Sequence, residues 1–500
     1  MRAYRPPAAT LPEPEDKRKG GALTGAARPG KVPTSTLKRS WMRALSIALT
    51  GLMLVSAPAG AQTPAPSEHA LLHQVVGEVQ PERMRADIEA MVGFGTRHTL
   101  SETQSDTRGI GAARRWVQRE FETISRDCDG CLTVVTPSDP VTGARVPTPT
   151  EVVDIVAIQR GTGDPNRVII ISGHLDSRVT DVMNFTDDAP GANDDASGVA
   201  AVLEAARVLS RHRFDATLVY AALSGEEQGL LGGKILADYA QAQGWRVEAN
   251  LNNDIVGNSE GQSGVRDTTR VRVFSEGTKT VETEAQEDRR RYNGGEVDSS
   301  SRNLARFIEG MADRYLANFD VEMIYRTDRY GRGGDQVEML RHGFPAVRIS
   351  EGAEHYDRQH QDLRVENGIR YGDTIDGVDF DYLGQVARLN IVSMAALANA
   401  PATPLGVTIE GAVRPDTTVK WQAVPGAAGY RVWWRSTTAP QWTHSRWAGP
   451  ATELVLPGVV IDDYFFGVSA VSDDGYQSPV VFPGPAGSFV SVGDPAPPAR

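Results

Sequence analysis

The stretch VIIISGHLDS at residues 168–177 decides the fold of this chain, together with the residues that follow it up to position 257. It is an apolar run, like a buried strand, that ends in side chains of the metal-binding kind. The runs VYAALSGEE (219–227) and LNNDIVG (251–257) have the same design. An open α/β sheet carries its functional residues where its strands end and in the turns that follow. The sequence therefore predicts an α/β domain with a site along one sheet edge.

Histidine and carboxylate side chains follow these apolar runs and the Gly-rich turn GANDDASG (191–198). Such groups bind zinc at about 2.0–2.2 Å, and two metals about 3.5–4 Å apart need a carboxylate between them. Each residue alone has an ordinary structural explanation, such as a turn or a helix start. Their joint occurrence favours a metal site. The residues are His174, Asp176, Asp194, Asp195, Glu226, Glu227 and Asp254.

Other hydrolase chemistries have little support in the sequence. There is no HExxH motif, and the one GxSxG match, at 257–261, lacks the directly flanking strand and helix that a nucleophile elbow needs. The two cysteines, Cys128 and Cys131, lie in the motif CDGC. In an exported chain this spacing predicts a local structural disulfide. A catalytic cysteine or serine is therefore not expected.

The first 61 residues predict export. A basic start precedes an apolar run over 44–55, which is too short to cross a bilayer, and Ala59–Ala61 fits a signal-peptide cleavage site. An uncleaved anchor is the alternative. We expect a secreted or periplasmic protein without a membrane span in the mature chain. Residues 62–500 hold 42 basic and 61 acidic residues, and this excess of negative charge argues against nucleic acid as a partner.

The remaining chain predicts two domains, at 62–400 and 401–500. Helical spacing occurs at 69–79, 81–91, 109–125, 197–209, 226–243, 299–319 and 382–397, and strand-like runs at 167–172, 216–223, 247–252, 271–274 and 344–350. We expect a mostly parallel mixed sheet with helices on both faces. Ser197 is a candidate cap of its helix, and residues 276–298 are expected to form an exposed insertion or loop. Five short strand-like runs after residue 406 predict a small β-sandwich.

The motifs SGHLDS (172–177), GANDDASG (191–198), SGEEQGLLG (224–232) and NNDIVG (252–257) together resemble the co-catalytic di-zinc exopeptidases of the bacterial leucine aminopeptidase type. The wider family includes glutamate carboxypeptidase and glutaminyl cyclase. The resemblance covers roughly residues 70–400. Residues 403–485, with Trp421, Tyr430 and Trp434, resemble a fibronectin type III domain.

The resemblance implies a role for each matching residue. Glu226 is implied as the general base and Asp176 as the carboxylate that orients His174. A late His is implied as the last ligand. We assign it to His360, which Asp362 would orient, although Gln359 stands where the family has a tyrosine. His355 is the reserve. Two zinc ions are implied, with the ligands His174, Asp194 (bridging), Glu227, Asp254 and His360.

An aminopeptidase acting on peptides is the leading functional hypothesis, with Asp335 as a candidate group for the substrate amine. A carboxypeptidase on the same scaffold is the first alternative, and Arg329, Arg332 and Arg348 are available for a substrate carboxylate. The second alternative is a non-catalytic secreted binding protein. The C-terminal domain is expected to aid contact with a surface or a polymeric substrate.

Overall fold

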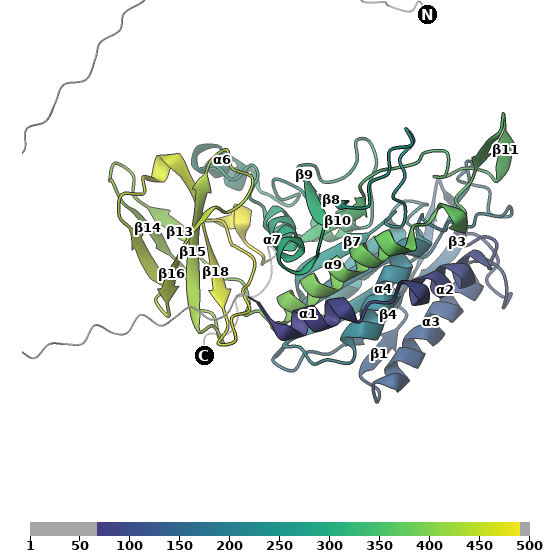
Figure 1. Cartoon of the computed structure of the whole chain (residues 1–500), viewed down its shortest axis with the longest axis horizontal. Coiled ribbons are helices and arrows are strands. Elements are labelled where there is room, and N and C mark those ends of the chain that lie inside the picture. Colours follow the sequence, from purple (N-terminus) through teal and green to yellow (C-terminus); the bar gives the residue numbers. More distant parts are fainter. Residues whose placement is uncertain (1–67, 491–500) are drawn as a thin grey trace, which may run out of the picture. The chain divides into compact units, whose positions relative to one another are not determined.

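The computed structural model describes residues 68–490 (Figure 1). The predicted signal peptide lies outside the described residues. An eight-stranded sheet organises the larger part of the fold, with strand order β1-β4-β6-β5-β7-β10-β8-β9. These strands are β1 (Leu132–Val135), β4 (Ile155–Gln159), β5 (Asp164–His174), β6 (Ala216–Leu223), β7 (Arg246–Asn253), β8 (Arg270–Phe274), β9 (Asp320–Ile324) and β10 (Ala346–Glu351).

The four central strands β6, β5, β7 and β10 run parallel, whereas the pairings β1–β4, β4–β6 and β10–β8 are antiparallel. Their carboxyl ends therefore share one edge of the sheet. This arrangement confirms the predicted mixed, mostly parallel sheet. Near this edge lies a two-stranded hairpin of β2 (Ser138–Gly143) and β3 (Val146–Val153), and a smaller one is formed by β11 (Arg364–Glu366) and β12 (Ile369–Tyr371).

Helices cover both faces of the sheet because the central strands carry apolar side chains on both of their faces. Along β5, Val168 and Ile170 pack with α5 and α8, while Ile169 and Ile171 pack with α4 and α9. Figure 1 shows α4 and α9 along the sheet. The helices are α1 (Ala70–Gly77), α2 (Pro81–Val92), α3 (Gly109–Asp127), α4 (Ala196–Leu209), α5 (Leu231–Ala242), α6 (Glu284–Asn293), α7 (Ser300–Tyr315), α8 (Gln336–Arg341) and α9 (Phe380–Asn399), with a short 3-10 helix at Ile375–Gly377. None of the described helices is long and apolar enough to cross a membrane.

Three local features differ from the predictions. Helix α4 is capped by Asp195, whose carboxylate accepts the Gly198 N–H at 2.9 Å, and not by Ser197. Helix α5 begins at Leu231, so the Glu226–Glu227 pair lies in a turn before it and not in its first turn. Residues 276–298 contain α6, which Thr283 starts with a capping box.

After α9 the chain forms two three-stranded antiparallel sheets. They have the orders β13-β14-β17 and β16-β15-β18, and their apolar side chains join one core that includes Val419, Val432 and Phe466. This is the small all-β sandwich predicted from the sequence. Its fibronectin type III character stays a prediction. The strands are β13 (Thr408–Glu410), β14 (Thr417–Lys420), β15 (Gly429–Ser436), β16 (His444–Gly449), β17 (Glu453–Leu456) and β18 (Tyr464–Val471), with 3-10 turns at Ile461–Asp463 and Pro485–Gly487.

Candidate metal centre

Six of the side chains singled out in the sequence meet at the carboxyl edge of the central strands. His174 is the last residue of β5, Asp254 directly follows β7, and Glu226 and Glu227 lie in the turn after β6. The other two come from connecting segments: Asp194 precedes α4, and His360 lies in the loop between β10 and β11. Parallel strands bring their carboxyl ends together, which explains why residues far apart in the sequence converge here.

Their geometry forms two ligand groups that share one carboxylate. His174 Nε2 lies 3.1 Å from Asp194 Oδ1 and 3.8 Å from Asp254 Oδ1. His360 Nε2 lies 3.0 Å from Asp194 Oδ2 and 2.9 Å from Glu227 Oε1. Each oxygen of Asp194 thus faces a different histidine. The first group is His174, Asp194 and Asp254, and the second is Asp194, Glu227 and His360.

These donor groups fit metal ions better than they fit one another. His174 Nε2 is buried and makes no well-aligned hydrogen bond, although Asp194 Oδ1 lies only 3.1 Å away. Burial lowers the pKa of His174, but contacts with Asp176, Asp194 and Asp254 raise it more, so the net shift is well upward. Buried carboxylates that crowd around two imidazoles are stabilised by a cation between them. Histidine nitrogen and carboxylate oxygen are donors that zinc prefers.

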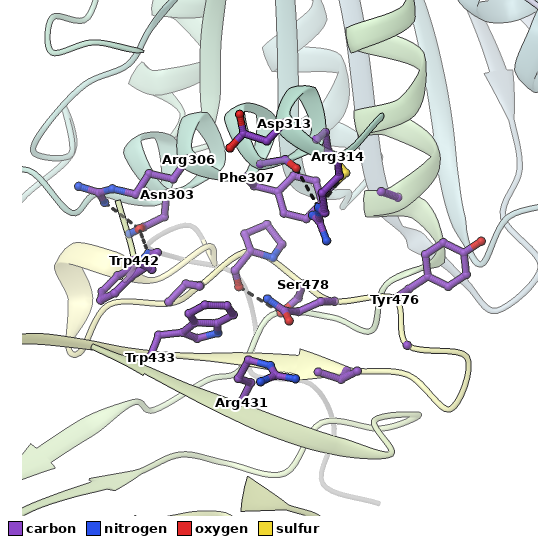
Figure 2. Close-up of a pocket in the computed structure, with 18 of the residues that line it drawn as sticks. Asn303, Arg306, Phe307, Asp313, Arg314, Arg431, Trp433, Trp442, Tyr476 and Ser478 are labelled. Atoms are coloured by element: carbon purple, nitrogen blue, oxygen red, sulfur yellow. Dashed lines mark hydrogen bonds between the residues drawn. The ribbon is translucent and has the colours of Figure 1, made fainter. Parts of the chain in front are cut away.

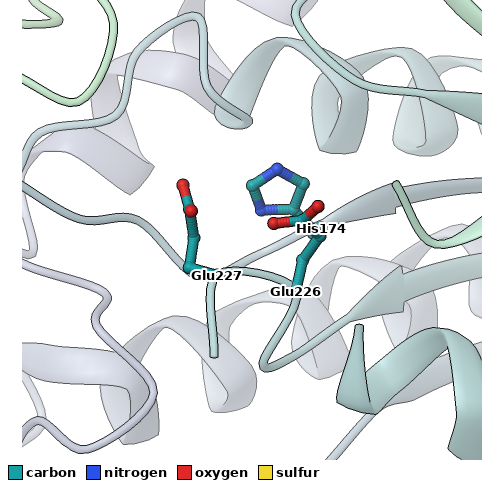
Figure 3. A group of neighbouring side chains, drawn as sticks. All are labelled: His174, Glu226 and Glu227. Atoms are coloured by element: carbon teal, nitrogen blue, oxygen red, sulfur yellow. The ribbon is translucent and has the colours of Figure 1, made fainter. Parts of the chain in front are cut away.

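Glu226 differs from its neighbour Glu227. Figure 3 shows the two side chains leaving the same turn with their carboxylates apart, and both lie beside the His174 ring. Glu226 belongs to neither of the two groups that share Asp194. Burial raises the pKa of Glu226 well above its ordinary value, and Glu227 and Asp254 add to the increase while His174 opposes it. A carboxylate with a raised pKa beside a metal site is suited to accept a proton.

Asp176 fixes the turn that carries both glutamates. Its carboxylate accepts the backbone N–H groups of Gly225 at 2.9 Å and of Glu226 and Glu227 at 3.2 Å each. On the ring side opposite the cluster, His174 Nδ1 lies 3.1 Å from the backbone carbonyl oxygen of Asp176 and 3.6 Å from its Oδ1. Asp176 therefore orients His174 chiefly through its backbone carbonyl and the turn through its carboxylate.

Further buried groups support the two aspartates. The Asp373 carboxylate accepts the backbone N–H groups of Asn193 and Asp194, the latter at 2.7 Å. Arg348 Nη1 lies 2.5 Å from Asp254 Oδ2, and the Arg348 side chain is fully buried. Burial raises the pKa of Asp254, but the Arg348 guanidinium and neighbouring groups together lower it more. The net effect holds the pKa of Asp254 well below its usual range. Arg348 therefore supports Asp254 and does not face a substrate.

Strained backbone also collects around the cluster. Leu230, Ile255 and His360 have φ angles of 61°, 59° and 50°, in the left-handed region that side chains other than glycine rarely adopt. His360 is itself a candidate ligand, Ile255 directly follows Asp254, and Leu230 lies three residues after Glu227. Such strain persists where the surrounding structure holds it, and it gathers at functional sites.

Among the secondary candidates, the pairing of Asp362 with His360 was wrong, and neither His355, the reserve for His360, nor Asp335 lies among the cluster residues. The Asp362 carboxylate accepts the Thr180 N–H at 3.2 Å, and His360 is not among its contacts in the described structure. His355 belongs to none of the described ligand groups. Asp335 is buried beneath the turn, where it accepts the Gly233 N–H at 3.0 Å, and it does not line the cavity over the cluster. The predicted disulfide between Cys128 and Cys131 is present.

A cavity of about 320 Å³ lies over the cluster. The arginines Arg145 and Arg178, which sequence reasoning did not single out, line it together with Arg329 and Arg332. Arg145 comes from the β2–β3 turn and Arg178 from the loop after β5, so no local motif connects them with the cluster. Only the assembled fold reveals them.

A second cavity of about 510 Å³ lies between α7 and the C-terminal strands (Figure 2). Trp433 and Trp442 line it, and Trp442 Nε1 donates to Asn303 Oδ1 at 3.1 Å. None of the described histidine–carboxylate groups contributes a residue to this cavity.

Comparisons with known proteins identify the family of the chain. Residues 154–369 match the model of Peptidase family M28. A protein of Leptosphaeria maculans described as "Probable zinc metalloprotease" is 44% identical over 431 residues, which is 85% of this chain and 99% of that protein. A "Probable zinc metalloprotease" of Pyricularia oryzae is 42% identical over 441 residues, 86% of this chain and 88% of that protein.

Among solved structures, the Legionella pneumophila LapA aminopeptidase is 18% identical, with a TM-score of 0.48, covering 69% of this chain and 76% of that one. A glutaminyl cyclase of Porphyromonas gingivalis is 16% identical, with a TM-score of 0.43, covering 63% of this chain and 98% of that one. These two likenesses do not bear on the activity of this chain. The long matches at 42–44% identity do establish its family. The chain belongs to peptidase family M28, together with these zinc metalloproteases.

Proposed function

We propose that this protein is a zinc-dependent exopeptidase that binds two zinc ions and uses Glu226 as its general base. The observation that carries the proposal is the position of Asp194, whose two carboxylate oxygens face His174 and His360 at 3.1 and 3.0 Å. A carboxylate shared between two ligand groups is what a two-metal site requires. His174 and Asp254 would hold one ion, and Glu227 and His360 the other.

Zinc at this site would polarise the peptide carbonyl and lower the pKa of a water molecule. Glu226 is in neither of the two groups that share Asp194, although it lies with His174 and Glu227 in a third group of possible donors. As the general base, its carboxylate would take the proton of the attacking water and deliver it to the leaving nitrogen. Asp176 keeps Glu226 in place through the backbone of the turn. General acid–base catalysis of this kind contributes about 10²–10⁴-fold to the rate.

The size of the cavity supports action at a chain end. A volume of about 320 Å³ is near the lower limit of ligand pockets. It suits one terminal residue better than a long stretch of peptide. Release of amino-terminal residues is the first candidate, as the resemblance to leucine aminopeptidases implies. A carboxypeptidase is the second candidate, and the arginines that line the cavity favour it.

The test combines metal content with activity on the mature chain. We expect chelation to abolish hydrolysis and zinc to restore it. Glu226→Gln should retain its zinc while kcat falls by about 10²–10⁴-fold. Aminoacyl-nitroanilides with a free amine and N-blocked peptides with a free carboxyl end distinguish the two candidates. A Glu226→Gln variant with unchanged kcat would overturn the assignment of the base, and activity that survives complete zinc removal would overturn the metal mechanism.

We also propose that the protein is exported, to the periplasm or the medium. The predicted signal peptide and the Cys128–Cys131 disulfide support this location. Amino-terminal sequencing of the protein recovered outside the cytoplasm should give a start near Gln62. Recovery of the protein only in the cytoplasm, with the cysteines reduced, would contradict the proposal.

A weaker proposal concerns contact with polymeric substrates through the C-terminal domain. The aromatic cavity beside Trp433 supports it. Trp433→Ala should lower hydrolysis of long peptides or proteins while hydrolysis of nitroanilides is unchanged. Equal loss on both kinds of substrate would indicate a purely structural role for this side chain.

A further inference from the structure

Arginines dominate the wall of the cavity over the candidate metal centre. They come from three separate segments: the β2–β3 turn supplies Arg145, the loop after β5 supplies Arg178, and the loop between β9 and α8 supplies Arg329 and Arg332. Leu230 is the one apolar side chain among the described lining residues. The cavity is therefore poorly suited to bind a large apolar side chain, and its character is set by charge.

The carboxylates in the lining do not offset these arginines once the metal is bound. All four of them, Asp194, Glu226, Glu227 and Asp254, belong to the cluster described above. Two divalent cations would balance their four negative charges. The guanidinium groups around the cavity then determine the sign of the potential that a substrate meets. This step rests on the proposed two-zinc function.

Two further carboxylates lie nearby, and each is shared among several arginines. Glu354 contacts Arg272 and lies 3.2 Å from Arg332 Nη1 and 4.0 Å from Arg329 Nη1. Asp328 lies 3.4 Å from Arg329 Nε and also faces a second arginine beneath the cavity. Positive charge is therefore in excess on this wall.

Two of the guanidinium groups keep donor capacity that the protein does not use. Arg329 Nη1 is buried and has no hydrogen-bond partner. Arg178 donates from Nε and Nη2 to the carbonyls of Val179 and Thr180, and its Nη1 is 3.9 Å from Glu227 Oε2. Bound zinc would draw Glu227 into its coordination. Fixed guanidinium groups with spare donors recognise carboxylates well, because their planar fork matches the two oxygens.

We propose that this cavity selects substrates that carry a carboxylate beside the scissile bond, with Arg178, Arg329 and Arg332 as the specificity-determining residues. The carboxylate has two possible sources. It is either the α-carboxylate of a C-terminal residue or the side chain of an acidic N-terminal residue. Both present the same group to the same wall, and a substrate with positive charge in this position is disfavoured.

Binding to a non-turning-over enzyme separates the two sources. The zinc-loaded Glu226→Gln variant is titrated by calorimetry with three probes. N-acetylglutamine carries only an α-carboxylate, the α-amide of N-acetylglutamate carries only a side-chain carboxylate, and N-acetylglutamine amide carries neither. We expect one carboxylate probe to bind at least about 10-fold more tightly than the neutral probe, as a charge-assisted contact implies. The tighter probe identifies the source.

The arginine variants connect this preference with named residues. Arg332→Gln and Arg178→Gln, each in the Glu226→Gln background, should weaken the preferred probe by about 10-fold and leave the neutral probe unchanged. Arg332→Lys should bind the preferred probe more tightly than Arg332→Gln, because lysine keeps the positive charge but lacks the two-pronged guanidinium group. The control is Arg291→Gln on α6, an exposed arginine that pairs with Glu287 and does not line the cavity. It should bind all probes as the parent does.

Turnover then separates this inference from the proposed function. In the active chain, kcat/KM should be higher for glutamyl-nitroanilide than for leucyl- and lysyl-nitroanilide, or higher for a peptide with a free C-terminus than for the same peptide with an amidated one. In either case Arg332→Gln should raise KM and leave kcat unchanged. Two results would overturn this inference and leave the proposed function intact. One is equal binding of all three probes. The other is a preference for the leucyl or lysyl substrate that Arg332→Gln does not alter. Tight binding of a carboxylate probe without zinc-dependent hydrolysis of any substrate would support the carboxylate site and overturn the proposed function.

Discussion

Two clusters of buried charged side chains in this molecule differ in how their charges are paired. At the carboxyl edge of the sheet, four carboxylates surround His174 and His360, and His174 Nε2 makes no well-aligned hydrogen bond. Between α7 and β15, the Asp298 carboxylate is fully buried between the guanidinium groups of Arg306 and Arg435, at 2.9 and 2.7 Å. In the first cluster, carboxylates converge on two histidines beside a cavity. In the second, one carboxylate lies between two arginines, and among their nitrogens Arg435 Nε alone is described as buried without a partner.

The surrounding backbone explains the difference. In the second cluster, backbone carbonyls take up spare donors: Arg306 donates to Val297 O and Pro440 O, and Arg435 to Ala439 O. In the first cluster, the acceptors face one another across a cavity. A buried charge must be paired or bound to a metal. Carboxylates and histidines that converge beside a cavity therefore indicate a bound cation, whereas a carboxylate enclosed by arginines and backbone carbonyls indicates a structural role.

The largest expected effect is the loss of the shared carboxylate. Asp194→Asn should lower kcat/KM by about 10³-fold or more, because one substitution disturbs both ligand groups. Excess zinc at 100–1000 times its Kd should stabilise the wild type by about 3–4 kcal/mol and the variant much less. Thermal unfolding with zinc and with chelator measures this difference. Equal stabilisation of both proteins would show that Asp194 is not a ligand.

Asp298→Asn should have the next largest effect, on stability alone. It leaves two buried arginines without their carboxylate, and breaking a buried ion cluster in this way costs about 3–5 kcal/mol. Denaturant unfolding measures the loss, and zinc content is the control that should not change. A variant that unfolds like the wild type would show that the carbonyls alone satisfy Arg306 and Arg435.

Glu276 sharpens the comparison as a buried carboxylate without a metal. Burial raises its pKa from 4.5 to about 7, against hydrogen bonds from Thr280. Because the folded state holds this proton more tightly than the unfolded state, the contribution of Glu276 to stability is complete below pH 4.5 and is lost as the pH rises to about 7. Glu276→Gln should therefore gain about 1–3 kcal/mol relative to the wild type between pH 4.5 and 7.5. Unfolding free energies of both proteins across this range provide the test, and parallel curves would contradict it.

The smallest expected effect is at an exposed ion pair. Lys420 Nζ lies 2.8 Å from Glu410 Oε1 on the surface of the C-terminal sheets. Solvent screens such a pair, so Glu410→Gln should leave the unfolding free energy almost unchanged. A loss as large as that of Asp298→Asn would show that burial does not set the difference between the ion pairs.

The sequence predicted those parts of the fold that local pattern determines. Helices α1, α2 and α3 begin and end within two residues of their predicted limits, because their apolar spacing is regular. The central strands β5, β6, β7 and β10 were found because they are buried on both faces and appear as continuous apolar runs. His174, Glu226, Glu227 and Asp254 were predicted because strand ends of a parallel sheet converge, Asp194 because it lies in a Gly-rich turn before a helix, and His360 from the resemblance to the di-zinc exopeptidases.

What the sequence did not predict depends on contacts between distant segments. Glu226 was expected in the first turn of a helix, but three N–H groups of its turn bind the distant Asp176, and helix α5 starts only at Leu231. Asp362 was expected beside His360, but a residue two positions away in a loop has no fixed direction, and it binds Thr180. Arg145 reaches the cavity only through the β2–β3 turn.

Zinc stoichiometry tests the central claim most directly. The metal-to-protein ratio of the reconstituted mature chain is measured by elemental analysis, together with His174→Ala and His360→Ala. Two ligand groups joined by Asp194 predict about two zinc ions in the wild type and about one in each variant. A wild-type ratio of about one that His360→Ala leaves unchanged would contradict the two-metal site.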